Sequence, residues 1–545
     1  MNQRRIGAVL SYTLLGVKNG VFLFFVPVVV NWLGKEQYGL YSIVGSFMAS
    51  LLILDMGLSN SVVRFVAKFR ALQDTQKEYA FLSTILGTYL FFALIASVIG
   101  IVLYFHLPRI FSNSLSTDQI AQLQVMFVFL IINVCLTLAF NPFRGVLAAY
   151  ERFIVLKGVE IFQQLLRVAL ILLLLMGYES VVCIVVADTV CRILAIVVRV
   201  AYTRKLGIHI RLAAVDWNII KEVFSYSFFI TINLIAYEIY WKTDNIILGI
   251  MTNASLVAVY SLGAQISSYY SHFSWSLSQV FTSKIVSLVE TGASGQRLTD
   301  ELIKTGRIQL MIISTVFLCF VFFGRSFIHL WVGTEFDESF TIALVIMIPM
   351  TVLLVQNIGI TILEAKRKHH FRSVTMLVMS VINIFSTMVL VKIMGIIGAA
   401  VSTAAGLILG NILMLNFYYH RVIRLDMIRY YAAVGKGILI AVCVVVTYGT
   451  VLETLFAREP SWVSLLLRIF SFCVVYGVSL WLVGANSSER KLLTDFFGFR
   501  IRRVKKTAAD SDSEKKEDGD RKEACADRRR VQNETISDCD DACQK

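Results

Sequence analysis

Long apolar blocks separated by short polar loops make up most of the first 485 residues. Each block holds roughly 20 or more residues, the length at which a helix rising 1.5 Å per residue crosses about 30 Å of hydrocarbon. The blocks are continuous rather than alternating, which excludes a membrane β-barrel. The pattern predicts an all-α polytopic membrane protein with about fourteen transmembrane helices, at residues 8–33, 39–63, 81–105, 122–146, 157–177, 180–202, 223–250, 256–286, 308–331, 340–363, 373–394, 396–418, 435–454 and 463–484.

Composition and motifs narrow the function. Hydrophobic residues make up 57% of the chain and charged residues 16%, against roughly 45–50% and about 25% in soluble domains. This excludes a disordered chain, a collagen and an ordinary soluble enzyme. The sequence has no G-x-x-x-x-G-K-[ST], H-E-x-x-H or paired-cysteine zinc motif. The outer loops, the longest near 106–121 and 332–339, are too short to carry the groups that a membrane glycosyltransferase or polymerase needs. We therefore expect no enzyme, no cofactor and no metal.

The distribution of charge predicts the orientation. The net charge is +14, but residues 507–545 contain more acidic than basic residues, so the positive excess lies in the membrane portion. With a cytoplasmic N-terminus, the cytoplasmic loops hold about 25 Lys and Arg, Arg199 and Arg372 among them, and the opposite loops hold about five, which satisfies the positive-inside rule. The first apolar block is too long for a cleavable signal peptide. We expect a cytoplasmic (inner) membrane protein with both termini cytoplasmic and no nucleic-acid partner.

The chain repeats itself at an offset of about 216–219 residues. Residues 141–153 (NPFRGVLAAYERF) and 357–371 (NIGITILEAKRKHHF) both place Asn six residues before Leu and then a basic cluster. Six predicted spans separate the two copies, and an even number keeps their orientation, so they predict parallel repeats. The expected domains are an N-terminal lobe (1–206), a C-terminal lobe (207–421), two further helices (422–486) and a basic, then acidic, disordered cytoplasmic tail (487–545).

A few charged residues lie inside predicted spans, where each costs about 2.5–3.5 kcal/mol on insertion scales and usually faces a cavity or a partner. Lys18 lies in the middle of span 8–33 and Asp55 lies in span 39–63. A structural ion pair between them is the alternative to a cavity role. Asp188 and Arg192, four residues apart, can neutralise each other on one helix. Asp188 can also pair with Arg167 of the neighbouring span.

Spans 223–250 and 256–286 carry a mixture of aromatic and polar side chains. Aromatic rings cover the C–H faces of sugars while polar groups bond the hydroxyls, so this mixture favours a sugar-binding lumen. An interfacial aromatic belt is the alternative. Glu238 and Lys242 can pair at i, i+4 spacing. The candidate lumen residues are Tyr237, Glu238, Lys242 and Asp244 on the first span, and Tyr269, Tyr270, His272 and Trp275 on the second.

Three motifs resemble those of one transporter family. Leu33 to Tyr41 matches L-G-x-x-x-Y-G-L-Y and is followed by Asp55-Met56-Gly57-Leu58. The segment from Asp244 to Tyr260 matches D-x-x-x-L-G followed by V-G-x-Y-S, except that Ala258 replaces the usual Gly. Arg144 to Leu147 with Glu151-Arg152-Phe153 is the third. Over residues 5–485 the sequence resembles the polysaccharide-biosynthesis oligosaccharide flippases of the multidrug/oligosaccharidyl-lipid/polysaccharide (MOP) exporter superfamily.

The resemblance implies two lobes around a central cavity that opens alternately to each side. It implies a polyprenyl-pyrophosphate-linked oligosaccharide as substrate, flipped across the cytoplasmic membrane for polysaccharides such as O-antigen or exopolysaccharide. The partners would then be the lipid-linked oligosaccharide, membrane lipids, a glycan polymerase and glycosyltransferases. Lys18 and Lys242, with Arg144 or Arg64 at the cytoplasmic mouth, would hold the pyrophosphate, and Asp55, Glu238 and Asp244 would gate or couple to ions. The last two spans would help to form a lipid groove.

Four alternatives remain open from the sequence. A cation-coupled multidrug exporter of the same superfamily predicts acidic lumen surfaces and drug resistance on expression. A lipid II flippase predicts a more Arg-rich cavity. A membrane enzyme of glycan assembly predicts glycosyl transfer by the purified protein. A purely structural partner of a glycan-assembly complex predicts no transport in reconstituted vesicles.

Overall fold

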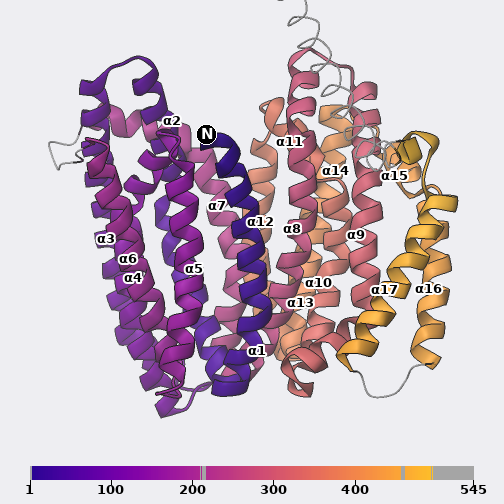
Figure 1. Cartoon of the computed structure of the whole chain (residues 1–545), viewed down its shortest axis with the longest axis horizontal. Helices are drawn as coiled ribbons and strands as arrows, with labels where there is room; N and C mark the ends of the chain where they lie inside the picture. The colour runs from indigo at the N-terminus through magenta and orange to yellow at the C-terminus, as the bar shows by residue number, and fades with distance from the viewer. Residues whose placement is uncertain (1–2, 209, 211–215, 456–460, 492–493, 495–545) are drawn as a thin grey trace, which may run out of the picture.

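A computed structural model describes residues 3–208, 210, 216–455, 461–491 and 494, and the regular elements in these ranges are all helical. Figure 1 shows long helices running side by side, with α3 to α6 at one end of the view, α16 and α17 at the other, and α1, α7 and α12 between them. The α-helices are α1 Gln3–Leu52, α2 Leu58–Ala71, α3 Thr75–Ile110, α4 Thr117–Ala149, α5 Phe153–Leu175, α6 Val182–Lys205, α7 Trp217–Met251, α8 Ala254–Glu290, α9 Gly295–Val332, α10 Asp337–Val355, α11 Ile358–Ala365, α12 His370–Met394, α13 Ile396–Gly406, α14 Leu415–Tyr418, α15 Met427–Gly435, α16 Ile438–Leu455 and α17 Trp462–Ser479.

The first helical stretch is two helices joined at a kink. Gly34 has non-helical dihedrals, with φ at +81°, a region that only glycine adopts without strain. After α1, Met56 and Gly57 are both left-handed and end a short 3₁₀ turn at Ile53–Asp55. Close packing fixes another glycine, since a Cβ on Gly39 would lie 1.8 Å from the Ala254 carbonyl oxygen at the start of α8.

Side-chain caps set the starts of several helices. Asp74 accepts from the Lys77 backbone N–H at the start of α3, and Asn253 accepts from that of Leu256 at the start of α8. Ser116 and Gln119 form a reciprocal capping box at the start of α4. Each cap satisfies a backbone N–H that the helix itself leaves unpaired.

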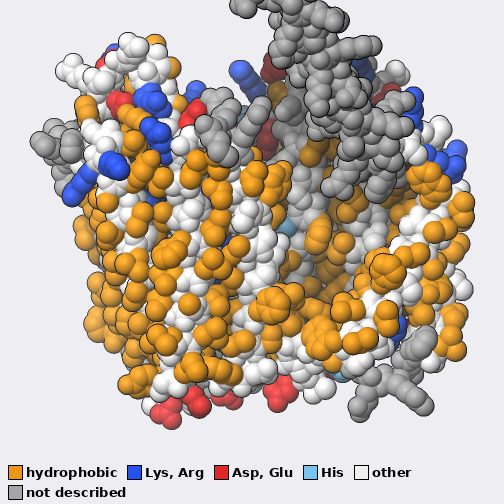
Figure 2. All heavy atoms as spheres, viewed as in Figure 1, with side chains coloured by type: hydrophobic (Ala, Val, Ile, Leu, Met, Phe, Trp, Pro, Cys, Tyr) orange, Lys and Arg blue, Asp and Glu red, His pale blue; other side chains and the backbone are white. Residues whose placement is uncertain are grey.

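The outer surface is apolar where a soluble protein would be polar. Figure 2 shows a broad hydrophobic band on the visible face, with Lys and Arg gathered mainly toward one end and Asp and Glu at both ends. In the described residues, ten helical stretches are long and apolar enough to cross a membrane. One of them, residues 6–71, contains the kink at Gly34 and is far longer than the roughly 20 residues that one crossing needs. The chain is therefore a multi-pass α-helical membrane protein.

A helix occupies each of the predicted ranges, with differences in detail. The predicted span 340–363 is divided into α10 and α11, and the span 396–418 continues from α13 into the π-helical turn Leu407–Met414. The short helix α15 was not predicted. Of the predicted disordered tail 487–545, residues 487–491 are helical, and the residues from 495 onward lie outside the described residues.

Candidate functional site

A polar pocket of about 800 Å³ opens between α1, α4, α5 and α6. Four cations line it: Lys18 from α1, Arg144 from α4, and Arg192 and Arg199 from α6. The carboxylate in its lining is Glu160 of α5. Because the other lining side chains, among them Asn141, Gln163 and Gln164, are mostly neutral polar groups, the pocket has a surplus of positive charge. We call it the cationic pocket.

The charges of the cationic pocket are only partly balanced. Arg144 Nη2 lies 3.2 Å from Glu160 Oε1, and Lys157 Nζ lies 3.1 Å from Glu160 Oε2. Arg192 Nη1 donates to the Thr137 hydroxyl at 2.5 Å, but within the described part of the chain its Nε is buried without a hydrogen-bond partner, as is the Nε of Arg199. Guanidinium groups with unpaired N–H donors favour an anionic ligand with several oxygens.

Asp188 forms its ion pair with Arg167 rather than with Arg192, which lines the cationic pocket. Arg167 of α5 contacts Asp188 through its Nε and also donates to the Tyr41 hydroxyl at 2.7 Å. The prediction that Asp188 is neutralised within this helix pair is therefore confirmed, with Arg167 rather than Arg192 as its partner.

Asp55 lies in a separate hydrogen-bond cluster at the break between α1 and α2. It accepts from Tyr89 of α3 at 2.8 Å and from Asn141 of α4 at 2.5 Å. Lys18 is not among its partners, so the predicted alternative of a Lys18–Asp55 ion pair is wrong. Asn141 also lines the cationic pocket, and it connects the helix break to that pocket.

A second pocket, of about 1000 Å³, lies between α7, α8, α10, α11, α12 and the turn Leu407–Met414. It contains two cations, Lys242 from α7 and Arg372 from α12. We call it the aromatic pocket, because rings cover part of its wall. Its aromatic and amide lining residues are Tyr237, Trp241, Trp275, Asn245, Gln265, Asn357 and Asn411.

Glu238 and Lys242 do not form the predicted i, i+4 ion pair. Glu238 Oε2 is buried without a hydrogen-bond partner among the residues that the structure describes, and Glu238 is not part of the lining of the aromatic pocket. Lys242 therefore stays available to a ligand in that pocket.

A lateral opening of about 930 Å³ lies between α1, α8 and α9. An aromatic run follows α8 from this opening to the aromatic pocket. Ring centroids lie 4.4 Å apart for Phe22 and Tyr269, 5.6 Å for Tyr269 and His272, and 5.9 Å for His272 and Trp275. Since Tyr269 and His272 line the opening and Trp275 lines the pocket, the two spaces share one wall.

The neighbouring Tyr270 does not belong to this wall. It is buried, and its hydroxyl lies 2.8 Å from that of Thr351 in α10. Consecutive helical residues point about 100° apart, so one of two adjacent tyrosines lines the opening while the other packs in the core.

Asp244 is buried and surrounded by hydrogen-bond donors. It accepts from Tyr260 at 2.6 Å, Thr403 at 2.6 Å, Thr387 at 3.0 Å and Asn383 at 3.4 Å. These donors come from α8, α12 and α13. Within the described ranges no cluster of three or more His, Cys, Asp or Glu is suited to a metal ion. Asp244 is a single carboxylate in a shell of neutral oxygens and an amide.

Within the described residues, four hydrogen bonds join α1 to the segment from α7 to α10. Lys35 Nζ donates to the Glu335 carbonyl at 2.8 Å, and Trp331 Nε1 donates to the Leu23 carbonyl at 2.6 Å. In addition, the Ser42 and Ser261 hydroxyls lie 2.9 Å apart, and Asn245 donates to Ser46 at 3.0 Å. Lys35 lies in the predicted outer loop and Ser42 lies near the start of the second predicted span, so these contacts hold the two halves together toward the predicted outer end.

The structure brings the predicted residues together in groups. Lys18 lies with Arg144 in the cationic pocket, whereas Lys242 lies with Tyr237 and Trp275 in the aromatic pocket. Among the pockets formed by the described residues, the two lysines therefore line different ones. Arg199 and Arg372 were assigned from sequence only to basic loops, and Arg192 only to neutralisation. The four side-chain amides of the aromatic pocket follow no spacing along the sequence that would predict their grouping.

The fold is that of the MOP superfamily of membrane transporters. The lipid II flippase MurJ in an inward closed conformation superposes with a TM-score of 0.66 at 14% identity, covering 87% of this chain and 97% of that one. An inward-facing multidrug resistance MATE family transporter of the MOP superfamily gives a TM-score of 0.62 at 13% identity, covering 77% and 95%. The MATE multidrug transporter DinF-BH gives 0.54 at 15% identity, covering 76% and 95%.

The sequence itself identifies the family. A family model of polysaccharide biosynthesis proteins matches residues 7–282, half of the chain. No curated protein matches the sequence. The chain belongs to the polysaccharide biosynthesis protein family, as the sequence resemblance predicted, and it shares its fold with solved membrane transporters.

Proposed function

We propose that the protein flips a polyprenyl-pyrophosphate-linked oligosaccharide across the cytoplasmic membrane for the synthesis of a cell-surface polysaccharide. The observation that carries this proposal is the cationic pocket, where four cations face a single lining carboxylate inside an apolar helix bundle. A pyrophosphate carries its charge on several oxygens, and the guanidinium groups of Arg192 and Arg199 match such oxygens by their fork of donors. Lys18 adds a point charge from α1.

The aromatic pocket and the lateral opening suit the other two parts of the substrate. The opening is mostly apolar and is lined from α1, α8 and α9, so a polyprenyl chain can stay in the lipid while the head group enters. Tyr269, His272 and Trp275 then offer ring faces along the path of the glycan. The hairpin of α16 and α17 packs on α9, which also borders the opening, and we assign it to the lipid groove.

The contacts between the two halves support alternating access. We propose that the end bearing Lys and Arg is cytoplasmic (Figure 2), so the closed end around Lys35 and Ser42 faces outward. Fourteen spans arranged as two parallel lobes, residues 1–206 and 207–421, with 422–486 as additional helices, are consistent with a helix in each predicted range. Rocking of one lobe against the other then opens the outer end and closes the inner one.

Ion coupling is assigned to Asp244. The Asp244 carboxylate and the hydroxyls of Thr387 and Thr403 bring oxygen atoms from three helices together. Oxygen atoms are the ligands of small hard cations, and a carboxylate also binds a proton. Asp55 lies at a helix break and Glu238 has a buried unpartnered oxygen, so we assign both to gating. The glycan polymerase and glycosyltransferases would act before and after the flipping step.

Transport of drugs is the second candidate, because MATE multidrug transporters share the fold. The surplus of cations in the cationic pocket disfavours the cationic drugs that such an exporter would carry. Drug resistance on expression, without glycan transport, would support this candidate instead.

Reconstituted vesicles test the proposal. A polyprenyl-pyrophosphate oligosaccharide is placed in the outer leaflet, and its protection from a membrane-impermeant glycosidase is followed with time. We expect protein-dependent protection, and none with protein-free vesicles. A parallel sample with lipid II distinguishes an oligosaccharide flippase from a lipid II flippase. Transport of lipid II without transport of the oligosaccharide would overturn the proposed substrate class.

A further inference from the structure

The aromatic pocket has its own cations, separate from those of the cationic pocket. Lys242 and Arg372 line the first pocket, and no residue lines both pockets. Among the described residues neither side chain has an ion-pair or hydrogen-bond partner, and the Nε of Arg372 is buried without one. A single pyrophosphate needs one cationic site, so this second site requires another explanation.

No carboxylate of the described residues lines this pocket. Glu238 lies one turn before Lys242 on α7 but does not line the pocket. Glu364, near the end of α11, is exposed and forms no ion pair with Arg372. The lining therefore holds two cations and no carboxylate. An uncompensated charge away from bulk water is costly, and an anionic ligand offsets that cost.

The rest of the lining matches a sugar. Three aromatic side chains and four side-chain amides surround the two cations, and this combination offers ring faces for C–H groups and donors and acceptors for hydroxyls. The amide oxygen of Asn245 is buried without a hydrogen-bond partner, although its nitrogen donates to Ser46. A ligand hydroxyl would satisfy that oxygen.

We propose that the transported glycan is acidic, and that Arg372 and Lys242 hold its carboxylate or an equivalent anionic group in the aromatic pocket. This inference rests on the proposed flippase function and adds the substrate class. An Arg fork binds a carboxylate through two parallel hydrogen bonds, and a nearby ammonium adds charge without demanding a fixed geometry. Arg372 and Lys242 are then specificity residues for the acidic sugar.

Binding to the purified full-length protein tests the inference directly. The probes are an oligogalacturonate and its neutral methyl ester, followed by the fluorescence of the pocket tryptophans. We expect the wild type to prefer the acid by about tenfold, the size of one charge-assisted hydrogen bond. Arg372→Gln and Lys242→Gln should each remove most of this preference, while Arg372→Lys should keep part of it. The exposed Lys392→Gln is the matched control.

Inorganic pyrophosphate serves as a second probe, which distinguishes binding of the pyrophosphate group from binding of the acidic sugar. Its binding should fall in Lys18→Gln and stay at the wild-type level in Arg372→Gln. Equal binding of acid and ester by the wild type would overturn the inference, as would an equal loss of pyrophosphate and oligogalacturonate binding in Arg372→Gln. Vesicle transport of a neutral lipid-linked oligosaccharide without any preference for acid would overturn it while leaving the flippase proposal intact.

Discussion

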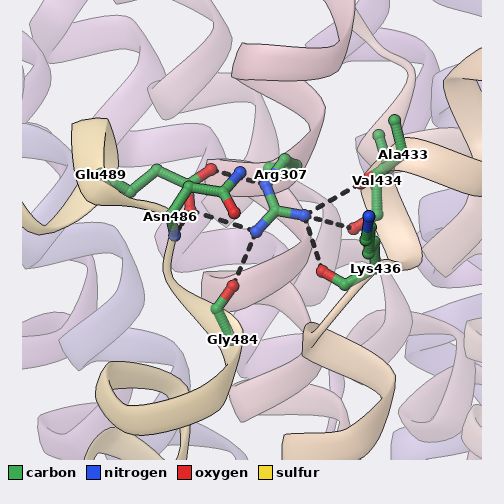
Figure 3. Close-up of polar contacts among 7 residues, drawn as sticks. All are labelled: Arg307, Ala433, Val434, Lys436, Gly484, Asn486 and Glu489. Atoms are coloured by element: carbon green, nitrogen blue, oxygen red, sulfur yellow. Dashed lines mark hydrogen bonds and ion pairs between the residues drawn. The ribbon is translucent and has the colours of Figure 1, made fainter.

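Arg307 of α9 and Glu489, beyond the end of α17, form a buried ion pair with 2.6 Å between Nε and Oε1. Figure 3 shows the Arg307 guanidinium between two chain segments, with Glu489 and Gly484 on one side and residues 433–436 on the other. Arg307 donates to the Gly484 carbonyl at 2.6 Å, the Lys436 carbonyl at 2.8 Å and the Ala433 carbonyl at 2.9 Å. One side chain thus ties both ends of the C-terminal hairpin to α9.

Loss of this side chain should destabilise the protein strongly. Arg307→Gln leaves Glu489 buried without its cation, and we expect a loss of about 3–5 kcal/mol in the free energy of unfolding. Denaturant unfolding in detergent micelles measures it. The exposed Arg325–Asp337 pair is the matched control, where Arg325→Gln should cost about 1 kcal/mol or less. Similar losses in both variants would contradict the role of Arg307. The double variant Arg307→Gln/Glu489→Gln should recover part of the loss.

Locking the closed outer end should stop transport. The hydroxyls of Ser42 and Ser261 lie 2.9 Å apart across the two halves. In a variant whose own cysteines are replaced, Ser42→Cys/Ser261→Cys should cross-link under a mild oxidant and lose vesicle transport, and a reductant should restore it. Full transport by the cross-linked protein would show that this contact does not have to open.

Asp244 should set the dependence on an ion gradient. Asp244→Asn removes the charge and keeps the shape, so the surrounding hydroxyls remain but a cation or proton loses its anionic partner. We expect transport that no longer responds to an imposed sodium or proton gradient, with oligogalacturonate binding unchanged. Wild-type gradient dependence in Asp244→Asn would remove this residue from the coupling site.

Two adjacent tyrosines should separate transport from stability. Tyr269 lines the lateral opening, so Tyr269→Ala should slow vesicle transport several-fold with little change in stability. Tyr270 is buried and lies 2.8 Å from the Thr351 hydroxyl, so Tyr270→Phe should cost about 1 kcal/mol in the free energy of unfolding and leave transport intact. The reverse outcome would mean that the aromatic run is not part of the glycan path.

The sequence determines the helices far better than the pockets. Length and continuity of the apolar blocks depend on the lipid, which acts on every residue in turn, so the predicted ranges match helices. The insertion cost of a single charge was enough to single out Lys18. The choice of Arg167 over Arg192 as the partner of Asp188 depends on how α5 packs against α6. No local pattern encodes that packing, and Arg372 looked from sequence like one more basic residue of a loop.

The most direct test of the account is vesicle transport by variants of the cationic pocket. We expect Lys18→Gln/Arg192→Gln to lower the transport rate of a polyprenyl-pyrophosphate oligosaccharide at least tenfold, because about two charge-assisted contacts are lost. Lys392→Gln, an exposed lysine at the end of α12, should transport at the wild-type rate. Wild-type transport by the double variant, at equal protein in the vesicles, would contradict the claim that this pocket holds the pyrophosphate.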